Sequence, residues 1–542
     1  MMDKLSAVAA ALSEWFRANG KLLIACFAVG LICHFQMYSQ GLTVFDGVIS
    51  EDSFDGYGWY VAGAWDIGLG RWGLKFASFA KSGLCSPVIV SSITLALFAI
   101  GIVAAVDFLG IKRPCLKYLT AIVMMVTPFI SSSLTYYYCS NSFGLSFLCA
   151  VVAVVLQGHA CDKAGFWRVA VAALLIAFSF GCYQSAMGVF CALGLASLVV
   201  EILGGSDLRR VASRFARLLL VLLIGTLLYL LINNAVLAYT GLSMGSYAGA
   251  SSVGLGNTLS HLPATVSLAY CSFYWVLFEH GIFGNYFMEP KFMLVYVAAL
   301  VLVFVLIAAR RENKGVRRWV SLVCVALFPL AANIVLLAVP DYSVPSVLMM
   351  GGFVVLLALL PALAQLFCFD GLNADSLPAK GRRIVFALSC IALTLLSWSY
   401  ALQSNADSEV MRIEQNQVQS LATRATDALQ SNADVQAGAK VLIAGTPQDG
   451  NYPLVSSFRS STSNYVKLGM ISSGECYNNL RCWHSITKEF AGVDMKFCTT
   501  EEYRALCQSA ELQAMPTYPN EGSVATINGV VVLKMSDTST WV

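Results

Sequence analysis

Charged residues are scarce in this chain. Asp, Glu, Lys and Arg make up 12% of its 542 residues, about half of the roughly 25% that is usual in soluble domains. Hydrophobic residues make up 58% and gather in long runs. The composition therefore predicts a membrane protein that crosses the bilayer several times. The net charge is only +3 and the cations form short clusters between apolar runs, so we do not expect a nucleic-acid-binding protein.

Several familiar motifs are also missing. The sequence has no CxxC pair, which argues against a zinc ribbon or a thioredoxin-like site. It has no Walker A loop, no HExxH and no Rossmann fingerprint after a strand. No cytoplasmic domain for a nucleotide sugar is recognisable either. An activated donor would therefore have to reach the protein from the lipid phase.

The apolar runs predict about eleven transmembrane helices, given the ~20 residues that a helix needs to cross the hydrocarbon core. The first run, 21–37, lacks a convincing cleavage site and is read as a retained helix. Residues 1–20 are mildly amphipathic and suit either a helix at the inner membrane surface or a solvated leader. The later runs cover 87–106, 119–134, 143–156, 169–180, 186–203, 218–239, 292–309, 320–339, 344–367 and 384–401.

Basic residues are concentrated in alternate loops, which the positive-inside rule assigns to the cytoplasm. These clusters are Lys112, Arg113 and Lys117; Lys163 and Arg168; Arg209, Arg210, Arg214 and Arg217; Arg310, Arg311, Lys314, Arg317 and Arg318; and Lys380, Arg382 and Arg383. The N-terminus is then inside, and an odd number of helices puts the C-terminal segment outside. We expect a transmembrane domain over 21–402 with long outer loops at 38–86 and 240–290, followed by an extracytoplasmic domain over 403–542.

The C-terminal segment predicts a small α/β domain. A polar helix fits 408–429, a strand fits 440–445, and a closing strand fits 527–535. Four of the 17 cysteines lie in this segment, and in an oxidising compartment they would form two disulfides. The sequence does not choose among the three possible pairings, and free thiols are the alternative. The four are Cys476, Cys482, Cys498 and Cys507.

An acidic cluster follows the first apolar run. Glu51, Asp52 and Asp55 lie together in a chain with only 31 Asp and Glu residues. A carboxylate here can act as a general base toward a sugar hydroxyl within hydrogen-bond reach. Because Glu51 and Asp52 are adjacent, their side chains diverge in an extended segment, and we favour Asp52 as the base. The alternative is that this acidic string caps a helix that begins near Tyr57, but acids at a membrane interface are usually functional.

The stretch 59–79 is rich in aromatic residues and glycine, which predicts a pair of helices at the membrane interface. Within it, Arg71 is the candidate for binding a phosphate, because a guanidinium group matches a pair of phosphate oxygens. Lys75 and Lys81 are the other cations nearby. The alternative is that Arg71 extends to lipid headgroups or pairs with Asp66.

Two more polar pairs lie on the predicted outer face. Tyr183 and Gln184 occupy a very short turn between two apolar runs, where they could contact a sugar hydroxyl or satisfy helix ends. Glu279 and His280 in the segment 240–290 are weaker candidates, since a lone histidine is more often structural than catalytic.

Together, the acidic pair, the GRW sequence with Arg71 and Trp72, and the GCYQSA sequence with Tyr183 and Gln184 resemble the serotype-converting type II Gtr glucosyltransferases. These are membrane enzymes of the GT-C class. The resemblance covers about residues 21–445 and implies a polytopic all-α, GT-C-like fold. It implies inverting transfer of a hexose, typically glucose, from a polyprenyl phosphate to a cell-surface glycan at the outer face of a bacterial plasma membrane.

The resemblance also implies roles for residues and partners. Glu51 or Asp52 would be the base, although the family pattern favours two aspartates and so leaves open which of them acts. Arg71 and Trp72 would lie by the donor phosphate. The remaining substrate-binding candidates are Asp55, Tyr183, Gln184, Glu279 and His280. The partners would be membrane lipid, the polyprenyl-phosphate sugar, the glycan acceptor, an enzyme that makes the donor and a flippase, while a divalent metal is left open.

Two other functions compete with this one. A transporter or flippase for lipid-linked sugars predicts internal repeats and polar residues in broken helices, whereas the apolar runs here are nearly free of ionisable residues and show no repeat. A polysaccharide polymerase or ligase predicts Arg-rich outer loops, whereas these outer loops are poor in cations. Glycosyl transfer from a lipid-linked monosaccharide is therefore the favoured hypothesis.

Overall fold

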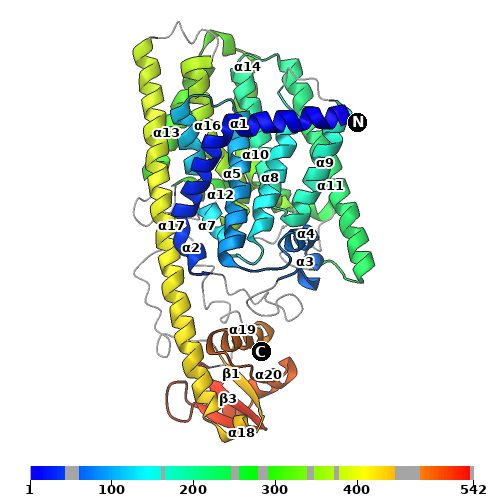
Figure 1. Ribbon diagram of the computed structural model, residues 1–542, viewed down its shortest axis with the longest axis vertical. Helices are drawn as coiled ribbons and strands as arrows, with labels where there is room; N and C mark the ends of the chain where they lie inside the picture. Colours follow the sequence, from blue (N-terminus) through cyan, green and yellow to red (C-terminus); the bar gives the residue numbers. More distant parts are fainter. Residues whose placement is uncertain are drawn as a thin grey trace. The chain divides into compact units, whose positions relative to one another are not determined.

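The computed structural model describes residues 2–42, 60–159, 165–245, 255–278, 291–337, 347–370, 378–445 and 476–537. The chain forms two compact units. The first comprises Met1–Ser39 and Val61–Asn405, and the second comprises Gln40–Tyr60 and Ala406–Val542. The described part of the first unit is built of helices, whereas the second combines helices with a small sheet (Figure 1).

Seven helices of the described residues are long and apolar enough to cross a bilayer, and the bent pair α6 (Pro114–Met125) and α7 (Pro128–Leu134), which meet at 43°, would make an eighth. Two further apolar helices, α8 (Ser140–Leu156) and α9 (Phe166–Cys182), are shorter. The chain is therefore a polytopic helical membrane protein, and the number eleven stays a prediction. The seven lie in α1 (Met2–Cys33), α5 (Pro87–Phe108), α10 (Ala186–Leu203), α11 (Leu208–Thr240), α13 (Lys291–Ala308), α16 (Gly351–Gln365) with a π-helical turn Leu366–Asp370, and α17 (Ala379–Gln430).

The packing of the first unit places α8 between α5 and α9, with α9 against α11 on its other side. Every residue of α16 from Gly351 to Gln365 is buried, and the helix packs against α10, α6 and α13. Glycines allow the closest approach: a Cβ at Gly188 of α10 would lie 2.3 Å from the carbonyl oxygen of Ala332. Close contact through small residues is typical of helices that pack in a membrane.

Two predicted segments of the first unit have different structures. The predicted outer loop 240–290 contains a 24-residue helix, α12 (Leu255–Phe278), which the sequence pattern hid because Pro263 lies inside it. The predicted helix 320–339 is divided into α14 (Val316–Ala326), α15 (Phe328–Ala332) and a 3₁₀ turn, Ile334–Leu337. Proline at 329 lacks the N–H that a continuous helix needs. The two segments touch, since the Tyr270 hydroxyl of α12 donates to the carbonyl of Ala326 over 2.6 Å.

The bend between α6 and α7 is stabilised by side chains. Pro128 has no N–H to offer the preceding turn, and the Thr127 hydroxyl donates instead to the Met124 carbonyl at 3.0 Å. The His34 Nε2 atom lies 3.1 Å from the Met125 carbonyl, so Nε2 carries the proton. His34 Nδ1 then accepts from the Ser404 hydroxyl of α17 at 2.9 Å. The fully buried imidazole thus joins the turn between α1 and α2 (Phe35–Ser39) to α6 and α17, which is how broken helices satisfy freed backbone groups in lipid.

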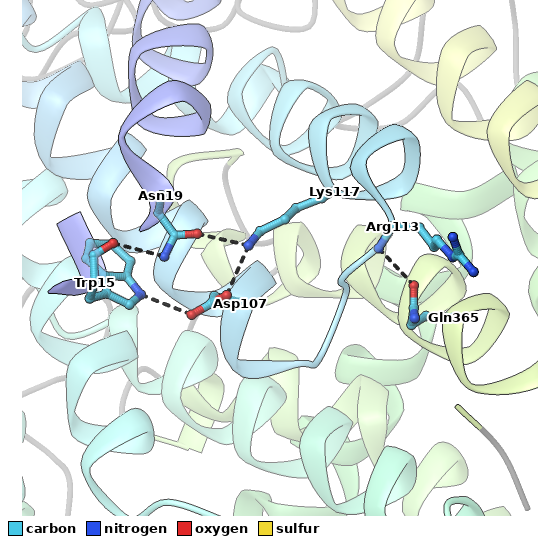
Figure 2. A network of polar contacts seen from close by, with 6 residues as sticks. All are labelled: Trp15, Asn19, Asp107, Arg113, Lys117 and Gln365. Atoms are coloured by element: carbon cyan, nitrogen blue, oxygen red, sulfur yellow. Dashed lines mark hydrogen bonds and ion pairs between the residues drawn. The ribbon is translucent and has the colours of Figure 1, made fainter. Parts of the chain in front are cut away.

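Helix α1 is continuous, so the predicted division near residue 20 is not a break in the helix. In Figure 1 its N-terminal part lies across the ends of other helices before it runs alongside them. Figure 2 shows what anchors it: the Trp15 indole donates to Asp107 at 3.0 Å, and Lys117 Nζ lies 2.9 Å from Asn19 Oδ1 and 3.0 Å from Asp107. The N-terminal part of α1 is therefore fastened to the end of α5 and the start of α6.

Several other basic clusters meet at this same end of the helical unit. Contacts join the α5–α6 loop to the end of α16 and the π-helical turn after it, that turn to the segment after α13, the start of α14 to the α10–α11 loop, and α10 to α11. The first unit therefore gathers on one end most of the loops predicted to be cytoplasmic. The contacts are Lys112 with Asp370 (3.3 Å), Arg113 N with Gln365 (3.0 Å), Arg310 with the Phe367 carbonyl (3.0 Å), Arg317 with the Ser206 carbonyl (2.6 Å), and the buried Arg214 with Glu201 (3.0 Å).

In the second unit, α17 continues as one helix to Gln430, so the predicted apolar span 384–401 and polar helix 408–429 belong to the same element. Strand β1 (Lys440–Ala444) lies where the sequence predicted it and pairs in parallel with β3 (Val530–Lys534). The predicted closing strand 527–535 contains β3 but starts too early, and β2 (Val524–Ile527), which forms a hairpin with β3, was not predicted. The hairpin turn is Asn528–Gly529, with φ of +52° and +78°, a sequence signal for a tight hairpin.

The three strands are ordered β1-β3-β2 and have apolar residues on both faces. Val441, Ile443, Val531 and Leu533 pack with Leu421 and Leu429 of α17 and Trp483 of α19 (Cys476–Ala491). Leu442 and Val532 pack on the other face with Tyr503 and Leu506 of α20 (Thr500–Cys507). Short helices α18 (Ala433–Gln436) and α21 (Ala510–Ala514) complete the described part. This is an α/β arrangement with a helix layer on each side of the sheet.

Two of the predicted disulfide cysteines, Cys498 and Cys507, are buried in the cluster beside α20. Burial raises the pKa of the Cys498 thiol to about 12, so at neutral pH that thiol is protonated and a poor nucleophile. The side chains of Cys476 and Cys482 lie outside the described residues. The pairing of the four cysteines stays a prediction.

Candidate functional site

Five of the residues predicted to act on substrate lie outside the described part of the chain. They are Glu51, Asp52, Asp55, Glu279 and His280. The choice between Glu51 and Asp52 as the base therefore stays a prediction. The other four, Arg71, Trp72, Tyr183 and Gln184, are described, and the structure brings them together.

Arg71 lies between two short helices, α3 (Ala64–Gly68) and α4 (Gly73–Ala80), which confirms the predicted helix pair. Gly70 ends α3 in the left-handed conformation, with φ of +76°. Its N–H donates to Ile67 O at 2.9 Å, and the Arg71 N–H donates to Asp66 O at 2.9 Å. This pair of bonds is the Schellman motif, in which glycine is the usual residue. The main chain therefore fixes the position of Arg71 directly.

The turn is also held from outside. The carbonyls at the end of a helix have no partner within it, and here the Leu69 carbonyl accepts from Gln184 Nε2 at 2.8 Å. The Gly68 carbonyl accepts from the Gly245 N–H at 2.8 Å. The Gln184 amide thus donates to the backbone of the turn, which supports the alternative that Gln184 satisfies a helix end.

The Arg71 guanidinium lies 5.6 Å from the centroid of the Tyr183 ring. Tyr183 is buried, ends α9 and meets Phe143 edge-on at 4.8 Å. A cation over an aromatic face is attracted by the ring electrons, so the ring helps to hold the half-buried guanidinium. Asp66 and Arg71 both lie near enough to the Cys139 thiol to act on it electrostatically.

Trp72 packs against α9. A Cβ at Gly181 would lie 2.5 Å from its indole ring. The ring also meets Phe178 and Phe76 edge-on, at centroid distances of 6.1 and 6.3 Å. Trp72 is 7% exposed, so its ring secures α4 to α9, and its predicted place beside a donor phosphate stays a prediction.

The two lysines near Arg71 differ in their surroundings. Lys75 is exposed on α4. Lys81, at the other end of α4, is buried and donates to the Leu84 carbonyl at 2.8 Å and to Cys85 Sγ at 3.7 Å. Burial lowers the pKa of the Lys81 ammonium group. Of these three cations, Arg71 is the one built into the turn between α3 and α4.

Two residues of this region were not identified from the sequence. Tyr229 and Asn233 of α11 lie against Gly70, the residue before Arg71. Their spacing of four places them on one face of the helix, and polar residues in an apolar helix were the available signal. Among the described residues no group of three His, Cys, Asp or Glu side chains is arranged to hold a metal ion.

The fold and this region define a multi-pass membrane protein in which an arginine is fixed beside aromatic rings at one end of the helices. A family model described as glucosyl transferase GtrII matches residues 44–357, which is more than half of the chain. The chain belongs to this family of glucosyltransferases, as the resemblance predicted. No curated protein and no solved structure matches it. The match includes Glu51, Asp52, Arg71 and the Tyr183–Gln184 turn but ends before α17.

Proposed function

We propose that this glucosyltransferase transfers glucose, with inversion, from a polyprenyl phosphate to a cell-surface glycan at the outer face of a bacterial plasma membrane. The observation that carries the proposal is Arg71. Its backbone is fixed by the Schellman turn, its turn is clamped by Gln184 and Gly245, and its guanidinium lies over Tyr183. A guanidinium held in this way can pair with two oxygens of one phosphate.

A lipid-linked donor suits the surroundings of Arg71. Helix α4 starts two residues after Arg71 and exposes Phe76 and Phe79, 60% and 59% accessible. Aromatic residues with an exposed apolar face are typical of the membrane interface. A donor whose chain dissolves in the bilayer presents its phosphate at that depth. The chain also lacks a nucleotide-binding motif, which supports a donor other than a nucleotide sugar.

The chemistry is a displacement at the anomeric carbon. Asp52 or Glu51 takes the proton of an acceptor hydroxyl, whose oxygen attacks the anomeric carbon from the side opposite the phosphate. The bond between that carbon and the phosphate oxygen breaks, and its electron pair leaves with the polyprenyl phosphate. Arg71 offsets the charge that grows on the departing phosphate, a contribution of about 3–4 kcal/mol where one such donor is removed from an enzyme. A general base contributes roughly 10²- to 10⁴-fold.

The test is transfer of radiolabelled glucose from polyprenyl-phosphate glucose to cell-envelope glycan by the full chain in lipid nanodiscs. Arg71→Ala should lower kcat by about 10²- to 10³-fold. Lys75→Ala removes an exposed cation from the neighbouring helix and should leave transfer near the parent value. Asp52→Asn and Glu51→Gln identify the base, because the substitution of the base should abolish transfer and the other should not.

The proposal fails if the folded parent makes no product from any polyprenyl-phosphate hexose with a complete acceptor preparation. Movement of the lipid-linked sugar without bond cleavage would then indicate a transporter. Growth of a chain from oligosaccharide donors would indicate a polymerase.

A further inference from the structure

Two polar side chains of α11 face the Arg71 turn. Tyr229 is 8% exposed and Asn233 is 3% exposed. A Cβ at Gly70 would lie 2.3 Å from the Tyr229 hydroxyl and 3.3 Å from Asn233 Oδ1. The main chain of the turn therefore lies directly against α11 at Gly70, and a residue with a Cβ would not fit there.

Gln184 connects Tyr229 to that turn. Its Nε2 atom donates to the Leu69 carbonyl at 2.8 Å and to the Tyr229 hydroxyl at 3.1 Å. An amide nitrogen has two protons, and these two contacts use both. The Tyr229 hydroxyl thus fixes the amide that holds Leu69, two residues before Arg71.

We propose that Tyr229 is a positioning residue for glucosyl transfer, acting through Gln184 on the turn that carries Arg71. The inference rests on the proposed function for Arg71 and deepens it. The α11 helix therefore sets where the phosphate-binding guanidinium lies, although no residue of α11 belongs to a recognised motif.

The position of a group that binds the leaving phosphate matters for rate, because a misplacement of about 1 Å can cost as much as 10²-fold. Tyr229→Phe is a narrow probe of this. It keeps the ring, which meets Phe180 edge-on at 6.1 Å, and removes only the hydroxyl that Gln184 contacts. The matched control is Tyr239→Phe, the same substitution on the same helix at a residue that is 92% exposed.

The experiment measures steady-state transfer by the full chain in nanodiscs with polyprenyl-phosphate glucose. For Tyr229→Phe we expect kcat/KM for the donor to fall about tenfold. A tenfold loss corresponds to about 1.4 kcal/mol, which is the size of one hydrogen bond. The KM for the acceptor and the Tm should match those of Tyr239→Phe. In the Arg71→Ala background, Tyr229→Phe should have no further effect, because it acts through Arg71. An equal loss in both backgrounds would overturn the proposal.

A second measurement needs no substrate. Amide hydrogen exchange of residues 66–72 should be faster in Tyr229→Phe than in the parent and unchanged in Tyr239→Phe. Unchanged exchange in Tyr229→Phe overturns the positioning role whatever the activity. If exchange is faster in Tyr229→Phe but the parent transfers no glucose, the proposed function is overturned. The role of Tyr229 in holding the turn would still stand.

Discussion

At the scale of single residues, Gly70 decides where Arg71 lies. It adopts φ of +76° and leaves no room for a side chain between the turn and Tyr229. Gly110 has a similar φ of +73°, but a Cβ there would meet nothing within 4 Å. Substituting both glycines therefore distinguishes the cost of the left-handed backbone, which both share, from the cost of the contact with Tyr229, which only Gly70 has.

We expect Gly70→Ala to lose more transfer activity than Gly110→Ala. Both variants carry the backbone penalty of a left-handed residue, about 1–2 kcal/mol. Gly70→Ala must also displace the Tyr229 hydroxyl, which would shift Arg71 and reduce donor kcat/KM by at least tenfold beyond Gly110→Ala. Transfer assays and Tm values of the two full-length variants check this. Equal transfer by the two variants would show that the contact with Tyr229 does not matter.

The sequence indicated which residues gather around Arg71 better than it indicated what they do. Tyr183 and Gln184 lie in the predicted short turn and reach Arg71 and its neighbours. The partner of Gln184 is a backbone carbonyl, and a carbonyl has no residue type by which a sequence could mark it. Tyr229 was missed for a related reason: the pattern of α11 shows a polar residue but not which element it faces.

At the scale of elements, one carboxylate makes two of the contacts that hold the N-terminal part of α1. Asp107 accepts from the Trp15 indole and from Lys117 (Figure 2). In Asp107→Asn one oxygen becomes an NH₂ group, so only one of these two donors keeps its acceptor. Because Asp107 is partly exposed, we expect a loss of about 1 kcal/mol, which is roughly a fivefold change in the opening equilibrium.

Hydrogen exchange of residues 10–20 measures that opening. It should be about fivefold faster in Asp107→Asn, whereas Asp427→Asn, an exposed aspartate of α17, should leave it unchanged. Equal exchange in the two variants would show that Asp107 does not hold α1 in place.

The elements that the sequence predicted well are those with uniform composition. Apolar runs at 87–106 and 186–203 became α5 and α10 with nearly the same limits. The prediction was wrong where one residue contradicts its surroundings. Pro263 hid α12, although a proline is tolerated in a membrane helix when neighbouring groups satisfy the backbone. Asn528–Gly529 was the opposite case, a clear turn signal that the predicted strand 527–535 included at its start, so that β3 was predicted and β2 was missed.

At the scale of the whole chain, the contacts between basic loops restrict the topology. Helix α11 starts at the end of the first unit where Arg214 contacts Glu201, and α13 finishes at the same end, where Arg317 contacts Ser206. An even number of crossings must therefore separate the far ends of α11 and α13. Because α12 is the one helix that the structure describes between them, we expect that it does not cross the membrane. The helix that the sequence missed thus leaves the predicted orientation of later segments unchanged.

The shared end of these helices predicts that the α5–α6 and α13–α14 loops lie on the same side of the membrane. Epitope tags inserted at Gly110 and Gly315, where a side chain meets open space, should both be reached by antibody only after spheroplasts are permeabilised, since basic loops stay in the cytoplasm. A tag after Asp537 should be reached in intact spheroplasts. Tags at 110 and 315 on opposite sides would contradict the arrangement of the first unit. Tags at 110, 315 and 537 all on one side would instead contradict an odd number of crossings, and with it an extracytoplasmic place for the α/β unit.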